Sequence, residues 1–296
     1  MHFRIILFLA ATCISFAALA QKKTQYVVHE DNSFERVRFS LSAPSASCFI
    51  RPGNIGKTIM VYGNAEPQLL DPIMSTELRE GILHAEFKLQ GGNRKAENVL
   101  AMKMLGSKGS ESKQNYNIYL SDKKPYDLDL HYGVGNAYLD LSGLAVEKLR
   151  IYTGSADVKV GYLTGDANLV EMDSFLVQVD LGSLEIHKIN KSRANHILAD
   201  VGFGSLLLDF SDKSENSCEI FASVGAGKLE VIMPFTESPI LIRLQSSPLC
   251  SVTLPSNFKE ISKNLYANQY YEGDDENLLN FDVNVAMGSI IFRHKE

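Results

Sequence analysis

The chain of 296 residues contains no tryptophan, only four cysteines and only nine prolines. Carbohydrate sites often use tryptophan faces, so this absence counts against a sugar-processing groove. The mean hydropathy of -0.06 excludes a protein with many membrane-spanning helices. The 29 basic residues are outnumbered by 35 acidic ones, and the net charge of -6 argues against nucleic acids and anionic membrane surfaces as partners.

Residues 1–20 have the pattern of a secretory signal peptide. A short basic start ends at Arg4, an apolar run extends from Ile5 to Ala18, and Ala18-Leu19-Ala20 fits the small-x-small cleavage rule. We therefore expect export, a mature chain that begins at Gln21, no integral membrane segment after cleavage, and a periplasmic, cell-surface or secreted location. The alternative is an uncleaved anchor, which would need about 20 apolar residues to span a bilayer.

The mature chain would keep an odd number of cysteines, namely Cys48, Cys218 and Cys250. An oxidising compartment permits disulfides, and the pairing of Cys218 with Cys250 stays open at this stage. We expect three small and largely buried thiols. No cysteine or histidine stands at short ligand spacing from another, so the sequence predicts no metal site.

One pattern recurs along the chain, and its clearest copy is LDLHYGVGNAYLDL at 128–141. Apolar and polar residues alternate into a glycine corner and alternate out again, which indicates a half-buried strand, a sharp bend and a second strand. In this interpretation inward-facing residues such as Leu139 and Leu141, or Val158 and Val160, line the interior. The predicted structural corners are Gly133, Gly135, Gly154, Gly182, Gly202, Gly204, Gly225, Gly227 and Gly288, with a glycine-free copy at Ser246–Cys250.

The last residue of each corner stands at position 135, 154, 182, 204, 227, 250 or 288. Successive corners are therefore separated by 19, 28, 22, 23, 23 and 38 residues. A period near 22 with two insertions is typical of a solenoid, in which each repeat buries its apolar face against its neighbours. With about 5–6 residues in a strand, a turn of this length has room for three strands. We expect an all-β, single-stranded, right-handed β-helix with three-sided coils of about 22 residues. The alternative is a β-sandwich built from hairpins.

The sequence also suggests a division into segments. Residues 21–115 are expected to form N-terminal β-rich coils and a cap, and residues 116–296 a solenoid with a capping insertion near 255–280. Solenoids need covered ends to remain soluble. The aromatic cluster of this insertion is interpreted as a cap, with a binding patch as the alternative; its members are Tyr266, Tyr270 and Tyr271.

A search for catalytic chemistry assigns no catalytic, cofactor-binding or metal-binding residue. The glycine doublets lack the third glycine of a nucleotide fingerprint, and none opens a helix. Acid–base work needs converging carboxylates, and the recurring acids are interpreted as outward side chains of alternating strands. These acids are Asp129, Asp140, Asp157, Asp180 and Asp200. The histidines are interpreted as solvated or singly hydrogen-bonded, and they are His131, His187 and His196.

Residues 115–163 contain the short motifs NIYL, LDL, GVG, LDLSGL and TGSA, which resemble those of a known family. They resemble the toast-rack family of bacterial envelope domains, which is related to the C-terminal part of LiaF-type cell-wall-stress regulators and to adhesin-like domains of unknown function. The resemblance extends over about Tyr116 to Arg293. It implies a β-solenoid outside the cytoplasm or on the membrane that serves interaction or sensing, with no catalytic residues to transfer.

The sequence therefore predicts an exported, non-catalytic β-solenoid that acts as an interaction, scaffold or adhesin-like module at the cell envelope. Its expected partner is an envelope protein or a surface glycan, with no cofactor and no nucleic acid. Self-association through the ends of the solenoid is a further possibility. The alternative function is a carbohydrate-active β-helix enzyme, a polysaccharide lyase or hydrolase, which a groove with converging Asp, Arg or Lys residues would favour.

Overall fold

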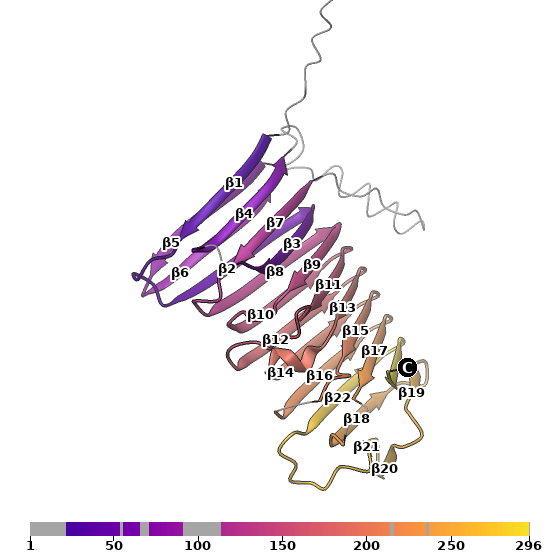
Figure 1. Ribbon diagram of the computed structural model, residues 1–296. Helices are drawn as coiled ribbons and strands as arrows, with labels where there is room; N and C mark the ends of the chain where they lie inside the picture. The colour runs from indigo at the N-terminus through magenta and orange to yellow at the C-terminus, as the bar shows by residue number, and fades with distance from the viewer. Residues whose placement is uncertain are drawn as a thin grey trace, which may run out of the picture.

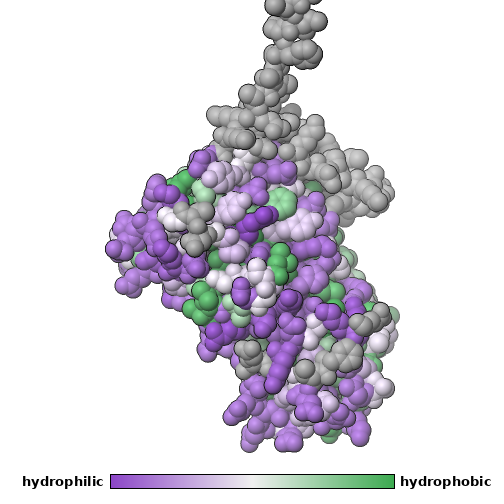
Figure 2. Space-filling model, viewed as in Figure 1, coloured by the Kyte–Doolittle hydropathy of each residue, from purple (hydrophilic) through white to green (hydrophobic). Residues whose placement is uncertain are grey.

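The computed structural model describes residues 22–53, 56–65, 71–90, 114–213, 216–234 and 237–295. Those ranges form β-strands in two large sheets, with a single 3-10 turn as their only helical element, so the all-β prediction is confirmed. Figure 1 shows the strands stacked one after another in an elongated array. On the face seen in Figure 2, hydrophilic residues dominate and hydrophobic ones lie in small separate patches.

The first sheet, sheet A, has 11 strands. In spatial order they are β1 (Lys22–His29), β4 (Lys57–Ala65), β7 (Asn115–Leu120), β3 (Ser47–Pro52), β9 (Asn136–Asp140), β11 (Asp157–Gly161), β13 (Ser183–Ile186), β15 (Ser205–Asp209), β17 (Lys228–Met233), β23 (Ser289–His294) and β19 (Ser251–Thr253).

The second sheet, sheet B, has 12 strands. In spatial order they are β20 (Lys259–Ser262), β21 (Leu265–Ala267), β18 (Ile240–Ser246), β22 (Leu279–Val285), β16 (Cys218–Val224), β14 (Ala194–Val201), β12 (Met172–Val179), β10 (Val146–Thr153), β8 (Tyr126–Val134), β2 (Arg36–Ser45), β6 (Ile82–Gln90) and β5 (Asp71–Arg79).

Each repeat contributes two strands, one to each sheet, so the expectation of three-sided coils is wrong. In the repeat that contains β12 and β13, the return to sheet B runs through the 3-10 turn η1 (Ile189–Ser192) instead of a third strand. Lys188 and Arg193 on either side of η1 both have φ of 54°, a left-handed conformation that an extended strand does not contain. The third stretch of this repeat is therefore a loop.

Neighbouring repeats pair in parallel and in register along the middle of both sheets. In sheet B the residues Leu128, Leu149, Phe175, Ile197 and Ile220 pair in succession at spacings of 21, 26, 22 and 23 residues. In sheet A the matching inward residues are Leu139, Val160, Ile186, Leu208 and Val231. All ten side chains are buried, and burial of one such side chain stabilises the fold by roughly 1.5–3 kcal/mol.

The corner glycines lie above one another between the sheets. A Cβ built on Gly135 would lie 2.4 Å from the carbonyl oxygen of Ala46, and one on Gly204 would lie 2.4 Å from that of Gly182. The same column continues through Gly227 to Gly288, whose Cβ would lie 2.2 Å from the Gly227 oxygen. Backbone therefore packs directly on backbone at this edge of the stack, and a side chain has no space there.

The repeats are not stacked in sequence order at the ends. At the C-terminal end β22 lies between β16 and β18, and β23 lies between β17 and β19. At the N-terminal end β2 lies between β6 and β8, and β3 lies between β7 and β9. The 38-residue interval before Gly288 therefore joins two adjacent coils, because β22 pairs with β18 and β23 pairs with β19, but the later coil lies inside the earlier one and pairs with β16.

Antiparallel strands cover both ends of the stack. The strand β21 pairs with β18, and β20 pairs with β21. At the other end β4 pairs with β7, and β5 pairs with β6. Because β2 pairs with β8 and β3 pairs with β9, the segments before and after residue 115 share both sheets.

The cysteines of the described residues are free thiols, so Cys218 and Cys250 do not pair. Burial raises the pKa of the Cys48 and Cys218 thiols to about 12, which leaves both protonated and unreactive at neutral pH. Residues 1–20, on which the signal peptide is expected, lie outside the described residues. Within the described ranges, no helix has the length and hydrophobicity needed to cross a membrane.

Candidate functional site

The outer face of sheet B carries three parallel rows of side chains. Alternate residues of a strand point outward, and in-register pairing aligns those residues along the axis of the stack. The first row is Arg38, Asp127, Lys148, Ser174, His196 and Glu219; the middle row is Asp129, Arg150, Leu176, Leu198, Phe221, Asp282 and Arg243; the third row is His131, Tyr152, Gln178, Asp200, Ser223, Asn284 and Gln245.

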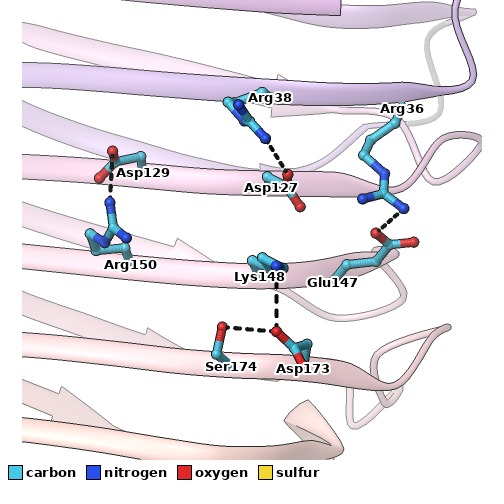
Figure 3. A network of polar contacts seen from close by, with 9 residues as sticks. All are labelled: Arg36, Arg38, Asp127, Asp129, Glu147, Lys148, Arg150, Asp173 and Ser174. Carbon is cyan, nitrogen blue, oxygen red and sulfur yellow. Dashed lines mark hydrogen bonds and ion pairs between the residues drawn. The ribbon is translucent and has the colours of Figure 1, made fainter. Parts of the chain in front are cut away.

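Charges at the N-terminal half of this face pair with one another across the strands (Figure 3). Arg38 lies 3.4 Å from Asp127, and Arg150 lies 3.5 Å from Asp129. Next to them Lys148 contacts Asp173, whose carboxylate also accepts a hydrogen bond from Ser174, and Arg36 contacts Glu147 at 2.6 Å. Exposed pairs of this kind contribute about 0–1 kcal/mol each to stability. Their main consequence is that these charges largely neutralise one another.

Beside these pairs lies a shallow groove of about 690 Å³, which is lined by residues of β8, β10, β12, β14, β16, β22 and β18. Three apolar side chains of the middle row form its floor: Leu176, Leu198 and Phe221. Leu198 is 40% exposed and Phe221 is 45% exposed. Large apolar side chains that adjoin one another at the surface are typical of binding sites.

The third row forms one wall of the groove. Asp200, Ser223, Asn284 and Gln245 pair in succession from β14 to β18 and all line the groove. In the described residues their side chains have no hydrogen-bond or ion-pair partner. Four neighbouring strands thus present polar groups that are available to a ligand.

Two aromatic rings stand at the far end of the same wall. The rings of His131 and Tyr152 lie 5.6 Å apart, and both residues line the groove. The Tyr152 hydroxyl donates a hydrogen bond to Asp180, and this bond raises the pKa of Tyr152. Asp180 also accepts a hydrogen bond from Gln178 at 3.3 Å. The aromatic end of the wall is therefore held in place by protein contacts.

The recurring aspartates do not converge. Asp140 and Asp157 lie on sheet A, where Asp140 accepts a hydrogen bond from the Ser142 hydroxyl at 2.6 Å and Asp157 accepts one from Ser183 at 2.8 Å. Asp129 and Asp200 lie on sheet B, in different rows and on strands separated by β10 and β12. The structure does not assemble these residues into one site.

The histidines are likewise dispersed over both sheets. His131 contacts Asp129 at 3.0 Å on sheet B, His196 contacts Glu219 at 3.5 Å on the same sheet, and His187 contacts Glu185 at 3.1 Å on sheet A. No cluster of three or more His, Cys, Asp or Glu residues suited to a metal ion occurs in the described part of the chain.

The outer face of sheet A carries a second ladder of ion pairs. Glu230 contacts Lys228 at 2.6 Å and Arg293 at 2.7 Å, and its side chain is 16% exposed. The hydrogen bond from Lys228, together with that from Arg293, lowers the pKa of the Glu230 carboxyl. Paired charges therefore occupy this part of sheet A.

The lowered pKa of Glu230 makes a testable contribution to pH dependence. A carboxyl whose pKa is lower in the folded state stabilises the fold above its ordinary pKa of about 4.3, and this stabilisation is lost as the pH falls through the lowered value. We expect Glu230→Gln to reduce the free energy of unfolding at about pH 7 by up to about 1 kcal/mol and to have little effect at about pH 3. Urea denaturation at both pH values measures the difference, with Glu171→Gln on an exposed side chain as the control.

The groove residues were not singled out by sequence reasoning, although a signal was present. Leu176, Leu198 and Phe221 occupy outward positions in three successive strands that otherwise carry polar residues there. In three repeats in a row, the middle outward position of the strand holds an apolar residue where the alternating pattern predicts a polar one. Comparison of the repeats with one another, instead of each with a polar/apolar template, would have revealed this row.

Comparisons with known proteins give one family match. The family described as the N-terminal domain of toast_rack, DUF2154, matches residues 20–183. The resemblance seen in the sequence begins at about residue 116, so the two overlap over residues 116–183. The family match also includes the N-terminal coils, which the resemblance did not. No curated protein matches the chain.

Three solved structures are similar to the chain at low sequence identity. A "putative cell adhesion protein" from Clostridium sporogenes is 17% identical with a TM-score of 0.46, and the alignment covers 93% of this chain and 99% of that one. A "putative lipid binding protein" from Parabacteroides distasonis is 13% identical with a TM-score of 0.40, covering 93% and 96%. A "putative adhesin" from Parabacteroides merdae is 10% identical with a TM-score of 0.26, covering 93% and 98%.

Proposed function

This chain belongs to the toast-rack family, and from that membership and its surface we propose that it is a non-catalytic interaction module of the cell envelope. The observation that carries the proposal is the groove on sheet B, where an apolar floor and an unpartnered polar wall occur together. The two sheets are proposed to be the faces of one right-handed β-solenoid, the handedness favoured for parallel crossover connections.

The arrangement of acids supports binding over catalysis. Glycoside hydrolysis uses two carboxyl groups that flank one bond, about 5–9.5 Å apart. The groove-lining acids Asp200 and Asp282 stand in different rows, on strands separated by β16, and Asp282 contacts Arg243 at 3.9 Å. The runner-up function, a polysaccharide lyase or hydrolase, therefore gains no support from a close pair of acids in the groove.

Export and end capping complete the proposal. Residues 1–20 would be removed as a signal peptide, and N-terminal sequencing of the protein recovered from outside the cytoplasm should begin at Gln21. The segment near 255–280 would cap the C-terminal end, because the strand β21 pairs with β18 and Tyr266 packs partly buried against the core. Tyr270 and Tyr271 remain half-buried in the same segment. Covered ends oppose end-to-end self-association.

The proposed binding face can be tested by affinity capture from envelope extracts. Leu198→Arg places a charged side chain on the groove floor, whereas Glu219→Ala changes an outward residue on β16 outside the groove. We expect the tagged mature protein and the Glu219→Ala variant to retain the same envelope components and Leu198→Arg to lose them. Equal retention by all three would exclude this face, and turnover of any polysaccharide would refute a non-catalytic role.

A further inference from the structure

The spacing of the groove matches a linear polymer better than a compact small molecule. Neighbouring strands lie about 4.7–4.9 Å apart, so the side chains of one row repeat at that distance along the axis of the stack. The residues that line the groove come from seven adjacent strands, from β8 to β18, which corresponds to a length of roughly 30 Å. A ligand that used the whole groove would be extended and parallel to the axis.

The chemistry of the groove is amphipathic across its width. Along the middle row the ligand would meet Leu176, Leu198 and Phe221, and along the third row it would meet hydroxyl, amide and carboxylate groups. Pyranose sugars have both parts, because their ring faces carry C–H groups and their edges carry hydroxyls. The polar side chains of Ser223 and Asn284 are both exposed and unpartnered in the described structure, so they can donate to and accept from such hydroxyls.

The charges around the groove oppose an anionic ligand. The basic residues at its two ends are already engaged, Arg150 with Asp129 and Arg243 with Asp282. Asp200 is exposed in the wall without a cationic partner, and the chain carries a net charge of -6. Both features oppose the approach of an anionic polymer.

We propose that the groove on the outer face of sheet B binds an uncharged, linear glycan of several sugar units, aligned with the axis of the stack. Its ring faces lie over Leu198 and Phe221, and its hydroxyls bond to Asp200, Ser223 and Asn284. Tyr152 and His131 supply ring surfaces at one end, a role for which tryptophan is not required. This inference rests on the proposed interaction module and names the ligand of the same groove.

The test uses an array of neutral linear glycans of at least four sugars, covering β- and α-linked hexoses and N-acetylhexosamines, followed by calorimetric titration of each hit and of its disaccharide. We expect at least one hit that binds more tightly than its disaccharide. Phe221→Ala combined with Ser223→Ala should weaken that binding about tenfold or more, because a floor contact and a hydrogen-bond partner are removed together. Glu219→Ala, two residues before Phe221 on the same strand, should leave the affinity unchanged.

Failure of the glycan proposal is separable from failure of the proposed function. Silence of the whole array, or equal affinity of the double variant and the wild type, overturns the glycan proposal. If the array is silent but an extended peptide or an envelope protein binds and the double variant loses it, the interaction module stands with a protein ligand. If neither glycan nor protein binding responds to the variant, both proposals fall.

Discussion

Substitution of Gly227 by valine is expected to lower the free energy of unfolding by about 3 kcal/mol or more, the upper range for forcing extra atoms into a packed interior. A Cβ at this position would lie 2.4 Å from the Gly204 carbonyl oxygen and 2.7 Å from the Val201 side chain. The first neighbour is a backbone oxygen that accepts a hydrogen bond from Lys228 of the next coil, so it cannot move without separating the coils. Valine adds two further methyl groups to this clash.

The measurement is the urea midpoint or the melting temperature by circular dichroism, for which we expect a fall of roughly 10 °C. Gly161→Ala is the matched control, because a Cβ there would lie 3.6 Å from its nearest neighbour, His187, in ordinary contact. We expect that control to melt within a few degrees of the wild type. Equal melting of Gly227→Val and the wild type would show that the coils are not in backbone contact at this corner.

Phe281→Ala is expected to cost about 3–5 kcal/mol, the usual effect of removing a buried phenylalanine ring. Phe281 on β22 is fully buried and pairs with Ile220 of β16 on one side and with Ile242 of β18 on the other. Its ring lies 5.5 Å from the ring of Phe210 and 5.4 Å from that of Phe292, both edge-on. Such aromatic pairs add to the burial of the ring.

Asn284→Ala on the same strand is the control for this prediction. Its side chain is exposed, so we expect a change within about 0.5 kcal/mol. Denaturant titration of both variants compares them directly. A small cost for Phe281→Ala would mean that β22 lies at the margin of the sheet and not within it.

The local part of the fold could be predicted from sequence because alternation fixes which side of a strand is buried. Leu139 and Val160 are inward and buried as the pattern predicts. The third strand of each coil was wrongly expected because a period near 22 fits two strands and a loop as well as three strands. Lys188 and Arg193 distinguish a loop from a third strand, because both adopt a left-handed conformation. No motif in the sequence predicts that conformation.

The order of the coils could not be predicted for a different reason. The inward residues Ile220, Ile242 and Phe281 are all large and apolar, so each of their strands can pack beside either of the others. Pattern specifies the face of a strand but not its neighbour. The floor of the groove lies on β12, β14 and β16, which stack in sequence order, whereas the place of Asn284 beside Ser223 in its wall depends on the order of the coils.

The most direct test of the stacking order is disulfide formation between outward residues of neighbouring strands, in a background with Cys250→Ser. Ser223 pairs with Asn284, whereas Gln245 is two strands away from Ser223 with β22 between them. A disulfide needs Cα atoms about 4.4–6.8 Å apart, which adjacent strands provide and strands separated by a third do not. We predict that Ser223→Cys with Asn284→Cys cross-links rapidly and that Ser223→Cys with Gln245→Cys does not. The reverse result would show that the coils stack in sequence order and would contradict the architecture on which the groove depends.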